Sequence, residues 1–572
     1  MSYRAPVADL AFALYEVAGM SALEPHMGGF DRAMAEAVLE AAGDLASGVL
    51  EPLNRSGDRQ GSRLENGRVI SPDGFPAAYK AFAEGGWNGL SADPAHGGQG
   101  LPNALQLAMF EMVNAANMAF ALCPTLTQAA IEALQRHGTD RQKSLYLPRL
   151  ISGEWTGTMH LTEPQAGSDL AAVRTLAEPD GQGGFRVTGQ KIFITWGDHD
   201  LTDNIVHLIL ARTPGAPEGV RGLSLFLAAS RLVNEDGSLA EANALKAAGL
   251  EHKLGIHASP TCVMVYEGAR AELVGELNRG LAHMFTMMNA ARVAVGAQGV
   301  GVAEGAYQHA LAYAHERRQG RAVWSPDYPA PIFEHPDVRA MLALMKARIE
   351  AARAICFAAG VAADLGHVLP DEAARHAAAL RAELLTPIAK AFATDVGVEV
   401  ASMAIQVHGG MGFIEETGAA QFYRDARIAP IYEGTNGIHA LDLVGRKLLI
   451  EDGAGVRDLL AEMAAIVPAL QAAEGLAEVA ARLQDGVQAA RQASAWLTER
   501  KGTADALAGA TPYLTLFSEV LGGFMLAKAA LADPARAALA RIYAARVLAL
   551  APGRLAAVTA GAGDLEAFDP TP

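Results

Sequence analysis

The chain has 572 residues, a length that predicts three to five domains of about 100–200 residues each. Its 46 lysines and arginines against 63 acidic residues give a net charge of −17. That balance argues against a nucleic-acid-binding protein, because phosphates require clustered cations. The 51% share of hydrophobic residues excludes a disordered chain. The cysteines are widely separated, which argues against a disulfide framework or a cysteine-based zinc site, and no metal site is predicted.

The N-terminal stretch does not resemble a signal peptide, since Asp9 and Glu16 interrupt it and a basic start is missing. We find no uncharged apolar run of about 18 residues, so no membrane-spanning helix is expected. The sequence therefore predicts a soluble, acidic, cytoplasmic protein that binds no membrane.

Residues 1–150 predict an N-terminal helical domain, because apolar residues recur at helical spacing in "DRAMAEAVLEAAGDLASGVLEPL" and in the segment before Gly138. Residues 151–275 consist of short β-rich runs, such as "FRVTGQKIFITWG" and "DNIVHLILART", bounded by Gly, Asp and Pro. They predict a middle domain built on an antiparallel sheet. No strand–helix–strand alternation is present, which argues against a doubly wound nucleotide-binding fold.

Residues 276–450 return to helical spacing and predict a helical bundle domain. Its "GVGVAEG" segment follows no strand, so we interpret these glycines as points of close helix packing, not as a phosphate loop. Residues 451–572 are rich in Ala and Leu and predict a C-terminal helical extension. The predicted fold class is α+β and mostly α.

Two segments allow a chemical as well as a structural interpretation. The loop "MHLTEPQAGSD", residues 159–169, is either a loop that closes a strand or a set of backbone N–H groups and small hydroxyls that approach a planar ligand. Glu433 lies between the apolar "IAPIY" and a Gly-Thr-Asn-Gly turn that opens a helix. Apolar surroundings raise a carboxyl pKa, so Glu433 is a candidate general base. The alternative is a carboxylate that stabilises the helix start.

Both segments belong to an ordered series of motifs that resembles the acyl-CoA dehydrogenase family. Between about residue 30 and 450 the series reads "GWNGLSADPAHGGQGLP", "LTEPQAGSD", "KIFITWG", "EHKLGIHASPTC", "ERRQGR", "QVHGGMGF" and "RDARIAPIYEGTNG". The resemblance implies the acyl-CoA dehydrogenase fold: a helical domain, a central antiparallel β domain and a C-terminal four-helix bundle, here followed by an extra helical domain. It also implies FAD-dependent removal of two hydrogens from the α and β carbons of an acyl-CoA thioester.

In this family a glutamate takes the α proton and FAD takes the β hydrogen as hydride at N5, and Glu433 matches the glutamate. The thioester carbonyl accepts hydrogen bonds from the backbone N–H of that glutamate and from a flavin ribityl hydroxyl, which offset the enolate charge. The resemblance assigns FAD contacts to Met159, Leu161, Thr162, Gly167, Ser168, Phe193, Ile194, Thr195, Arg317, Gln406, Gly409, Gly410, Thr435 and Asn436.

Part of the FAD site is expected to come from a neighbouring subunit. In the family, residues at Arg317 and in the 406–410 loop serve the FAD of a partner, so a homo-oligomer is implied. The sequence departs from the family at "ERRQGR", which lacks the usual Phe-Gly, and at Gly437, where Gln is common. The first departure implies a different loop after Arg317, and the second implies the loss of one FAD contact.

The resemblance assigns substrate contacts to Ser168, Asn289, Arg292 and Gly434. For Arg292 the structural alternative is an ion pair on the helix surface. Met284, Met287 and Met288 have the spacing of a core-facing helix stripe, and a soft wall of the acyl pocket is the alternative.

The N-terminal segment and the extension resemble a long bacterial subgroup that includes 3-(methylthio)propanoyl-CoA dehydrogenases of dimethylsulfoniopropionate breakdown. The resemblance implies an electron-transfer flavoprotein as acceptor and a homodimer, with a tetramer as the alternative. Straight-chain acyl-CoA dehydrogenation and a direct acyl-CoA oxidase stay open. A DNA-associated flavoprotein of the same fold is disfavoured, because residues 451–572 hold ten basic and fourteen acidic residues.

Overall fold

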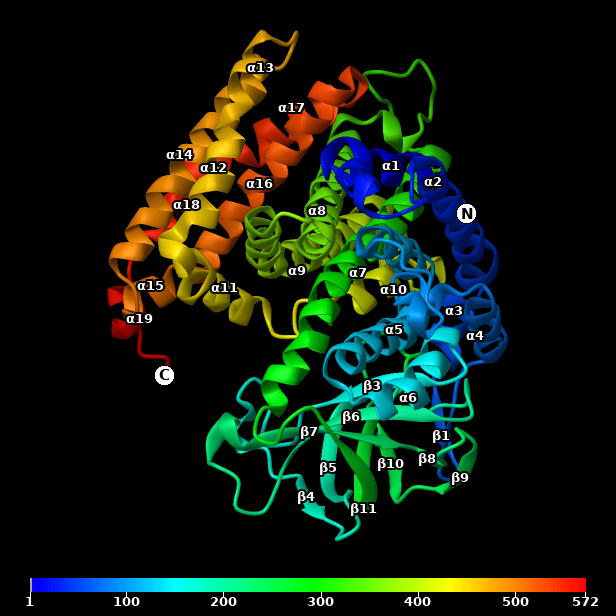
Figure 1. Ribbon diagram of the computed structural model, residues 1–572. Coiled ribbons are helices and arrows are strands. Elements are labelled where there is room, and N and C mark those ends of the chain that lie inside the picture. Colours follow the sequence, from blue (N-terminus) through cyan, green and yellow to red (C-terminus); the bar gives the residue numbers. More distant parts are fainter. Residues whose placement is uncertain (1–2, 572) are drawn as a thin grey trace.

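The computed structural model describes residues 3–571, and its first part is helical apart from one hairpin (Figure 1). The helices are α1 (Val7–Phe12), α2 (Arg32–Leu45), α3 (Glu51–Gln60), α4 (Phe75–Glu84), α5 (Asn103–His137) and α6 (Asp140–Ser152). The hairpin of β1 (Arg63–Glu65) and β2 (Arg68–Ile70) was not predicted. Two Asp side chains of the middle domain accept hydrogen bonds from the backbone of this hairpin region, at Val69 and Ser71.

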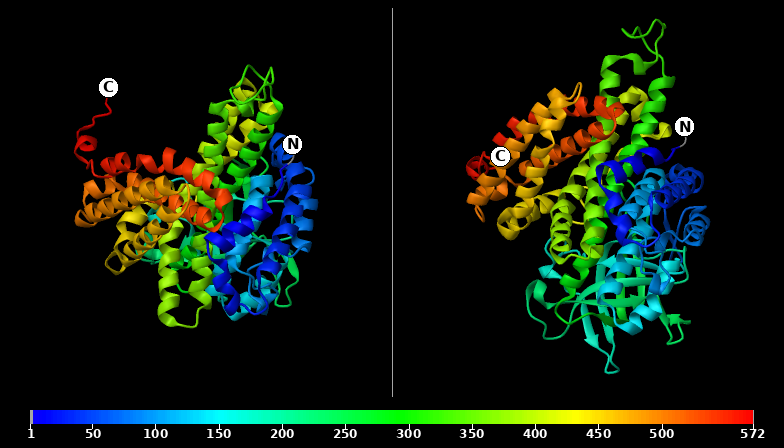
Figure 2. Two further views of the ribbon diagram at one scale, coloured as in Figure 1. Left: turned by 90° about the horizontal axis from the view of Figure 1, so that it is seen from above. Right: turned by 45° about the horizontal axis from the view of Figure 1, so that its top comes forward.

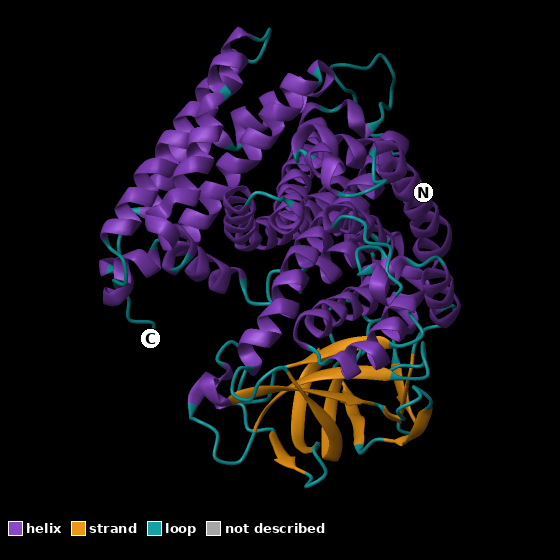
Figure 3. Cartoon of the chain, viewed as in Figure 1, coloured by secondary structure: helices purple, strands orange, loops and turns teal. Residues whose placement is uncertain are grey.

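The middle part is a seven-stranded sheet at one end of the molecule (Figure 3). Its strands are β3 (Thr156–His160), β4 (Leu176–Pro179), β5 (Phe185–Thr195), β6 (Ile205–Arg212), β7 (Leu223–Ala229), β10 (Leu245–Leu250) and β11 (Thr261–Val274). A separate hairpin comprises β8 (Arg231–Val233) and β9 (Leu239–Ala242). The prediction of a purely antiparallel sheet is wrong in one respect, because β6 pairs in parallel with β3 and with the end of β4.

Three long helices dominate the next part: α7 (Gly280–Glu316), α8 (Pro336–Val368) and α9 (Glu372–His408). The short α10 (Ala419–Ala426) and α11 (Asn436–Gly445) follow. The glycines of "GVGVAEG" do allow close packing, as predicted. A Cβ atom at Gly299 would come within 2.4 Å of the Ala393 carbonyl oxygen on α9.

The C-terminal extension forms a separate bundle beside α8 and α11 (Figure 2). Its helices are α12 (Ala454–Ala465), α13 (Val467–Ala472), α14 (Ala477–Glu499), α15 (Ala504–Ala508), α16 (Ala510–Ala532), α17 (Ala537–Arg546), α18 (Ala551–Val558) and α19 (Gly563–Ala567). Helix α16 lies at its centre and packs against both α8 and α11. The fold class is thus the predicted one, a mostly helical α+β protein with an added helical part.

Charged residues join the N-terminal helices to the bundle and to the extension. The fully buried Arg353 pairs with Glu111, Glu304 and Glu350, which come from α5, α7 and α8. Nearby, Asp9 of α1 accepts from Lys346 of α8 at 2.9 Å and from Arg536 of the extension at 2.8 Å.

Among residues 3–571, two helices are long and apolar enough to cross a membrane by length and composition, namely α5 and α16. Their most apolar windows are 100% and 83% buried within the protein. Both are therefore core helices of this fold, which explains their apolar composition without a bilayer.

Candidate active site

Glu433 lies in the loop between α10 and α11, and its backbone is in the left-handed region with φ of 54°. Gly434 follows with φ of 85°. A non-glycine residue pays roughly 1–2 kcal/mol for this conformation, so surrounding contacts must hold it.

Three helices supply those contacts. From α11, His439 Nε2 donates to the Glu433 carbonyl oxygen at 3.1 Å. From α9, Lys390 Nζ donates to the Gly434 carbonyl oxygen at 2.8 Å. The hydroxyl of the preceding Tyr432 donates to Gln298 Oε1 on α7. The loop that carries the candidate base is therefore anchored on several sides.

The surroundings of Glu433 favour a base that can exchange a proton near neutral pH. Burial raises the pKa of its carboxyl to about 7, although the positive charges of Arg292 and Lys390 oppose the rise. A carboxyl with a pKa close to the working pH is well suited to general base catalysis. Such a pKa is compatible with the acid–base interpretation of Glu433, and the role of this residue stays a prediction.

A cavity of about 660 Å³ lies between α5, α7, α8, α9 and α11. Predicted substrate contacts Asn289 and Arg292 both line it, and Arg292 Nη1 donates to Asn289 Oδ1 at 3.3 Å. Arg292 is only 7% exposed, so its alternative as a surface ion pair is wrong. Because its charge also acts on Glu433, Arg292 links the cavity to the candidate base.

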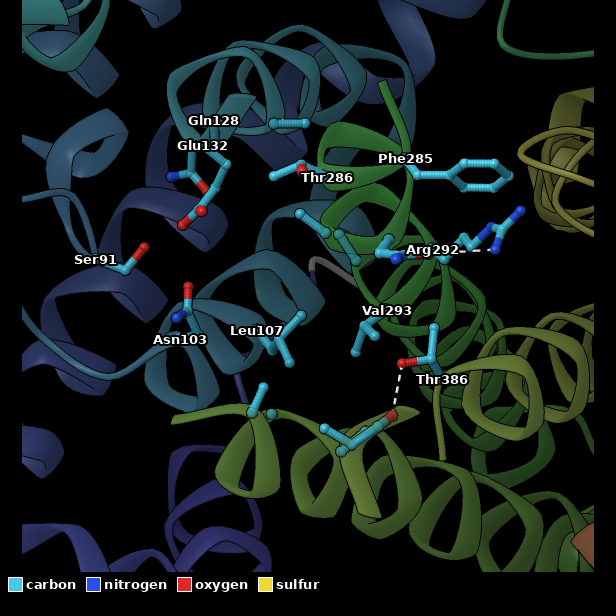
Figure 4. A pocket seen from close by; sticks show the side chains of 18 of the residues that line it. Ser91, Asn103, Leu107, Gln128, Glu132, Phe285, Thr286, Arg292, Val293 and Thr386 are labelled. Atoms are coloured by element: carbon cyan, nitrogen blue, oxygen red, sulfur yellow. Dashed lines mark hydrogen bonds between the residues drawn. The ribbon is translucent and has the colours of Figure 1, made fainter. Parts of the chain in front are cut away.

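The opposite wall of the cavity carries both polar and apolar side chains. In Figure 4, Ser91, Asn103, Gln128 and Glu132 from the N-terminal part lie across the cavity from Thr286 and Val293 of α7. None of the three stripe methionines is among the lining residues of this cavity. Met284 and Met287 are instead fully buried between α7 and the sheet domain, which confirms the core interpretation of the stripe.

The structure brings together the predicted FAD contacts of the middle domain. Ile192 N donates to the Thr162 carbonyl oxygen at 2.9 Å, and Thr158 Oγ1 donates to the Thr195 carbonyl oxygen at 2.8 Å. The end of β3 with Met159, Leu161 and Thr162 therefore lies next to the end of β5 with Phe193, Ile194 and Thr195.

This surface suits a planar cofactor ring. Phe193 has φ of 59° and is 58% exposed, so the backbone presents an aromatic ring to the outside. Gly167 and Ser168 are exposed in the adjoining loop, and nothing lies within 4 Å of a Cβ built on Gly167. Ile194 is different, because its side chain is buried in the sheet core and only its backbone can meet a ligand.

A buried ion pair shapes the same loop. Lys191 Nζ donates to Glu163 Oε1 at 2.8 Å and to the Leu161 carbonyl oxygen at 2.9 Å. Glu163 also accepts from the backbone of Arg174 and Thr175. Burial opposes the ionisation of Glu163, but Lys191 and these donors hold the pKa of the carboxyl at about 2.

The remaining predicted FAD contacts fall elsewhere. Arg317, Gln406, Gly409 and Gly410 are exposed where α7 and α9 end side by side. Helix α7 starts against the sheet and leads away from it, so one chain does not bring these residues to the sheet surface (Figures 1 and 2).

Thr435 and Asn436 have roles in the fold itself. Thr435 caps α11 by accepting from Ile438 N at 3.2 Å. The Asn436 amide accepts from Lys390 at 2.9 Å and donates to Asp395 Oδ1 at 2.8 Å. A side-chain contact from Asn436 to FAD would compete with these bonds.

Sequence reasoning missed the residues that hold the loop, chiefly Lys390, His439 and Gln298. One signal was present: Lys390 is a lone cation in the apolar run "LLTPIAKAFA". A charge in such a run has to meet a partner inside the protein, because burying it alone is very costly.

Comparison with known proteins identifies the class. Family models match in order: "Acyl-CoA dehydrogenase, N-terminal domain" over residues 34–154, "middle domain" over 158–269 and "C-terminal domain" over 278–449. A fourth, "Acetyl-CoA dehydrogenase C-terminal like", matches residues 459–569.

The chain therefore belongs to the acyl-CoA dehydrogenase family, and its reaction is the FAD-dependent dehydrogenation of an acyl-CoA. It is 49% identical to the 3-methylmercaptopropionyl-CoA dehydrogenase of Ruegeria pomeroyi, over 94% of this chain and 92% of that protein. It is 36% identical to a butyryl-CoA dehydrogenase of Syntrophomonas wolfei, over 78% of this chain and 75% of the relative.

Solved structures agree on the fold, extension included. The Caenorhabditis elegans protein ACDH-11, solved in complex with C11-CoA, matches with a TM-score of 0.80 over 96% of this chain and 92% of that one. At 22% identity this likeness concerns the fold alone.

Proposed function

We propose that this enzyme dehydrogenates 3-methylmercaptopropionyl-CoA, with Glu433 as the base that removes the α proton. The observation that carries the proposal for Glu433 is its raised pKa in an anchored loop, together with the charge of Arg292, which acts on Glu433 and lines the cavity with Asn289. Support for the substrate is the 49% identity over nearly the whole length to an enzyme with that name.

The protein's own contribution to the reaction is to orient the thioester and to take a proton. Asn289 and Arg292 are placed to bind the acyl-CoA, and the carboxylate of Glu433 accepts the α proton. The residues at the ends of β3 and β5 would hold FAD, which when bound accepts the β hydrogen with its electron pair. The partly desolvated base gains proton affinity, which helps it to act on a weak carbon acid.

Glu433→Gln tests the assignment of the base. The variant should keep its FAD and still bind acyl-CoA, yet lose flavin reduction by a factor of about 10³ or more in stopped-flow measurements, because the amide cannot accept the proton. Glu415→Gln, an exposed carboxyl near α10, serves as the control and should behave like wild type. Bleaching of the flavin by Glu433→Gln at near wild-type rate would show that another group is the base.

The substrate is tested by comparing kcat/KM for 3-methylmercaptopropionyl-CoA, butanoyl-CoA and octanoyl-CoA. The name of the 49% identical relative favours the methylthio substrate. We expect the methylthio substrate to be preferred. The alternative is a straight-chain enzyme, supported by the 36% identical butyryl-CoA dehydrogenase, and it would be favoured if butanoyl-CoA or octanoyl-CoA were turned over best.

We propose further that an electron-transfer flavoprotein reoxidises the flavin and that the protein is a homodimer. Support for an oligomer is that the two groups of predicted FAD contacts lie far apart within one chain. Light scattering would distinguish the dimer from a tetramer. Full turnover with peroxide release and no added acceptor would instead indicate an oxidase. The cytoplasmic location stays a prediction.

A further inference from the structure

A single lysine of α9 forms hydrogen bonds to the turn that carries Glu433. Lys390 is completely buried, and its Nζ donates to the Gly434 carbonyl oxygen at 2.8 Å and to Asn436 Oδ1 at 2.9 Å. Both acceptors lie within three residues of the proposed base. An ammonium group loses its hydration at such a position, so these bonds have to compensate for the loss.

The side-chain amide of Asn436 forms further hydrogen bonds to the same helix, α9. Its Nδ2 donates to Asp395 Oδ1 at 2.8 Å, to Thr394 Oγ1 at 3.1 Å and to the Ala391 carbonyl oxygen at 3.1 Å. The segment from Lys390 to Asp395 therefore holds the turn through its backbone and through a side chain. Such a hold is needed because Glu433 and Gly434 are both left-handed.

Lys390 is also one of the charges that face the Glu433 carboxyl. The other is Arg292 on α7. Asp395 on α9 faces Lys390, and Asp442 and Arg446 on α11 face Arg292. His439 is neutral at working pH, because burial lowers its pKa to about 3. Burial likewise lowers the pKa of Lys390 to about 7, and the carboxylates of Glu433 and Asp395 limit that fall.

We propose that Lys390 is a positioning residue for proton abstraction: it fixes the turn of residues 433–436 through its bonds to Gly434 and Asn436 and, while protonated, acts on the base as a buried positive charge. The inference rests on the proposed role of Glu433. A neighbouring cation stabilises the carboxylate form, so its removal leaves a base that holds its proton up to a higher pH.

Lys390→Met removes both the charge and the hydrogen bonds, Lys390→Arg keeps the charge, and Thr394→Val removes one bond to the Asn436 amide without altering any charge. Each holoenzyme is assayed for flavin reduction by 3-methylmercaptopropionyl-CoA across pH 5.5–9, a range chosen around the pKa of about 7. Hydrogen–deuterium exchange of the peptide covering 430–437 reports on the turn independently of catalysis.

For Lys390→Met we expect the acid limb of the rate profile to move up by about half a pH unit or more, together with faster exchange in the turn. Lys390→Arg should bring the limb back toward wild type even if the maximal rate is reduced. In Thr394→Val the peptide of residues 430–437 should exchange hydrogen faster, while the acid limb of the rate profile stays at its wild-type pH. FAD content and Tm, measured alongside, show that each variant is folded.

An unmoved acid limb in a folded Lys390→Met variant would overturn the proposal and leave Lys390 as a purely structural residue. If Lys390→Met does not fold, Lys390→Arg provides the test. An acid limb that moves in Lys390→Arg by the full shift expected for Lys390→Met would also overturn the proposal, because Lys390→Arg keeps the charge. Failure of the proposed function has a different signature, namely persistent flavin reduction by Glu433→Gln.

Discussion

Glu433 combines two features that are unfavourable for a folded protein, a left-handed backbone and a desolvated carboxyl. Each costs of the order of 1–3 kcal/mol, and such costs gather where a residue is held for a reaction. The bonds from Lys390, His439 and Tyr432 offset them by anchoring the loop.

The pH dependence of the reductive step follows from this residue. The pKa of Glu433 is raised to about 7, so the group is protonated below that value and unable to accept the α proton. We expect kcat/KM to fall about tenfold per unit as pH drops below 7 and to level off above it. Stopped-flow reduction in overlapping buffers measures this. An acid limb near pH 4.5, the ordinary range of a glutamate, would contradict the raised pKa.

At the scale of single residues, the sequence predicts the candidate base but not the residues that hold its loop in place. Glu433 stands out because apolar residues precede it and a glycine turn follows. Lys390 is noticeable only as a lone cation in the apolar run "LLTPIAKAFA", and helical spacing does not tell which groups it binds. Its partners, Gly434 and Asn436, are more than forty positions away in the chain, and only the packing of α9 against α11 brings them together.

At the scale of elements, the surface at the ends of β3 and β5, which carries predicted FAD contacts, depends on the Glu163–Lys191 pair that joins the β3 loop to β5. Both side chains are essentially unexposed. A buried ion pair of this kind is costly to break, because the remaining partner keeps an uncompensated charge.

Lys191→Met should therefore destabilise the protein by about 3–5 kcal/mol and weaken FAD retention, since Glu163 and the Leu161 carbonyl lose their donor. Thermal unfolding followed by flavin fluorescence measures both effects. Lys246→Met, which breaks an exposed pair with Glu267 on the same sheet, is the control and should change stability by less than about 1 kcal/mol. Equal losses in the two variants would show that burial of the pair is unimportant.

The packing of α7 on α9 gives a second prediction at this scale. Gly299→Ala places a methyl group 2.4 Å from the Ala393 carbonyl oxygen, so the helices must separate, and we expect a loss of about 1–3 kcal/mol. Gly553→Ala on α18 meets no atom within 4 Å and should be neutral or slightly stabilising. Thermal denaturation compares them. A Gly299→Ala variant as stable as Gly553→Ala would contradict the close approach.

Sequence patterns predicted the sheet strands as runs but not all their partners. The alternation of β3 is the same whether its neighbour is parallel or antiparallel, so its parallel pairing with β6 could not be inferred. The β1–β2 hairpin was missed because its strands are three residues each. Long helices were recognised more easily, since their period repeats over many turns.

At the scale of the whole molecule, Asp9 joins three separate parts of the chain. Burial opposes its ionisation, but Lys346 and Arg536 outweigh burial and hold the pKa of Asp9 at about 2. The N-terminal helix, the bundle and the extension are thus connected at one carboxylate.

Asp9→Asn should lower Tm at pH 7 and have a smaller effect near pH 2.5. The folded pKa of Asp9 lies below its ordinary value of 3.8, so its stabilising contribution is complete above that value and is lost as pH falls toward 2. Asp44→Asn, in the neighbouring α2, is a control for the change in net charge. A Tm difference that is independent of pH would contradict a charge-based contact.

Arg317 lies far from the ends of β3 and β5, where the other predicted FAD contacts are, and this has a genetic consequence if two copies complete each FAD site. A chain with Arg317→Ala and a chain with Phe193→Asp would each be defective alone, yet their heterodimer would contain one site with both lesions and one with neither. Co-expression of the two mutant chains should therefore restore part of the activity, in the manner of intragenic complementation. The restored activity would show that each functional site is built from two chains, without a structure of the assembly.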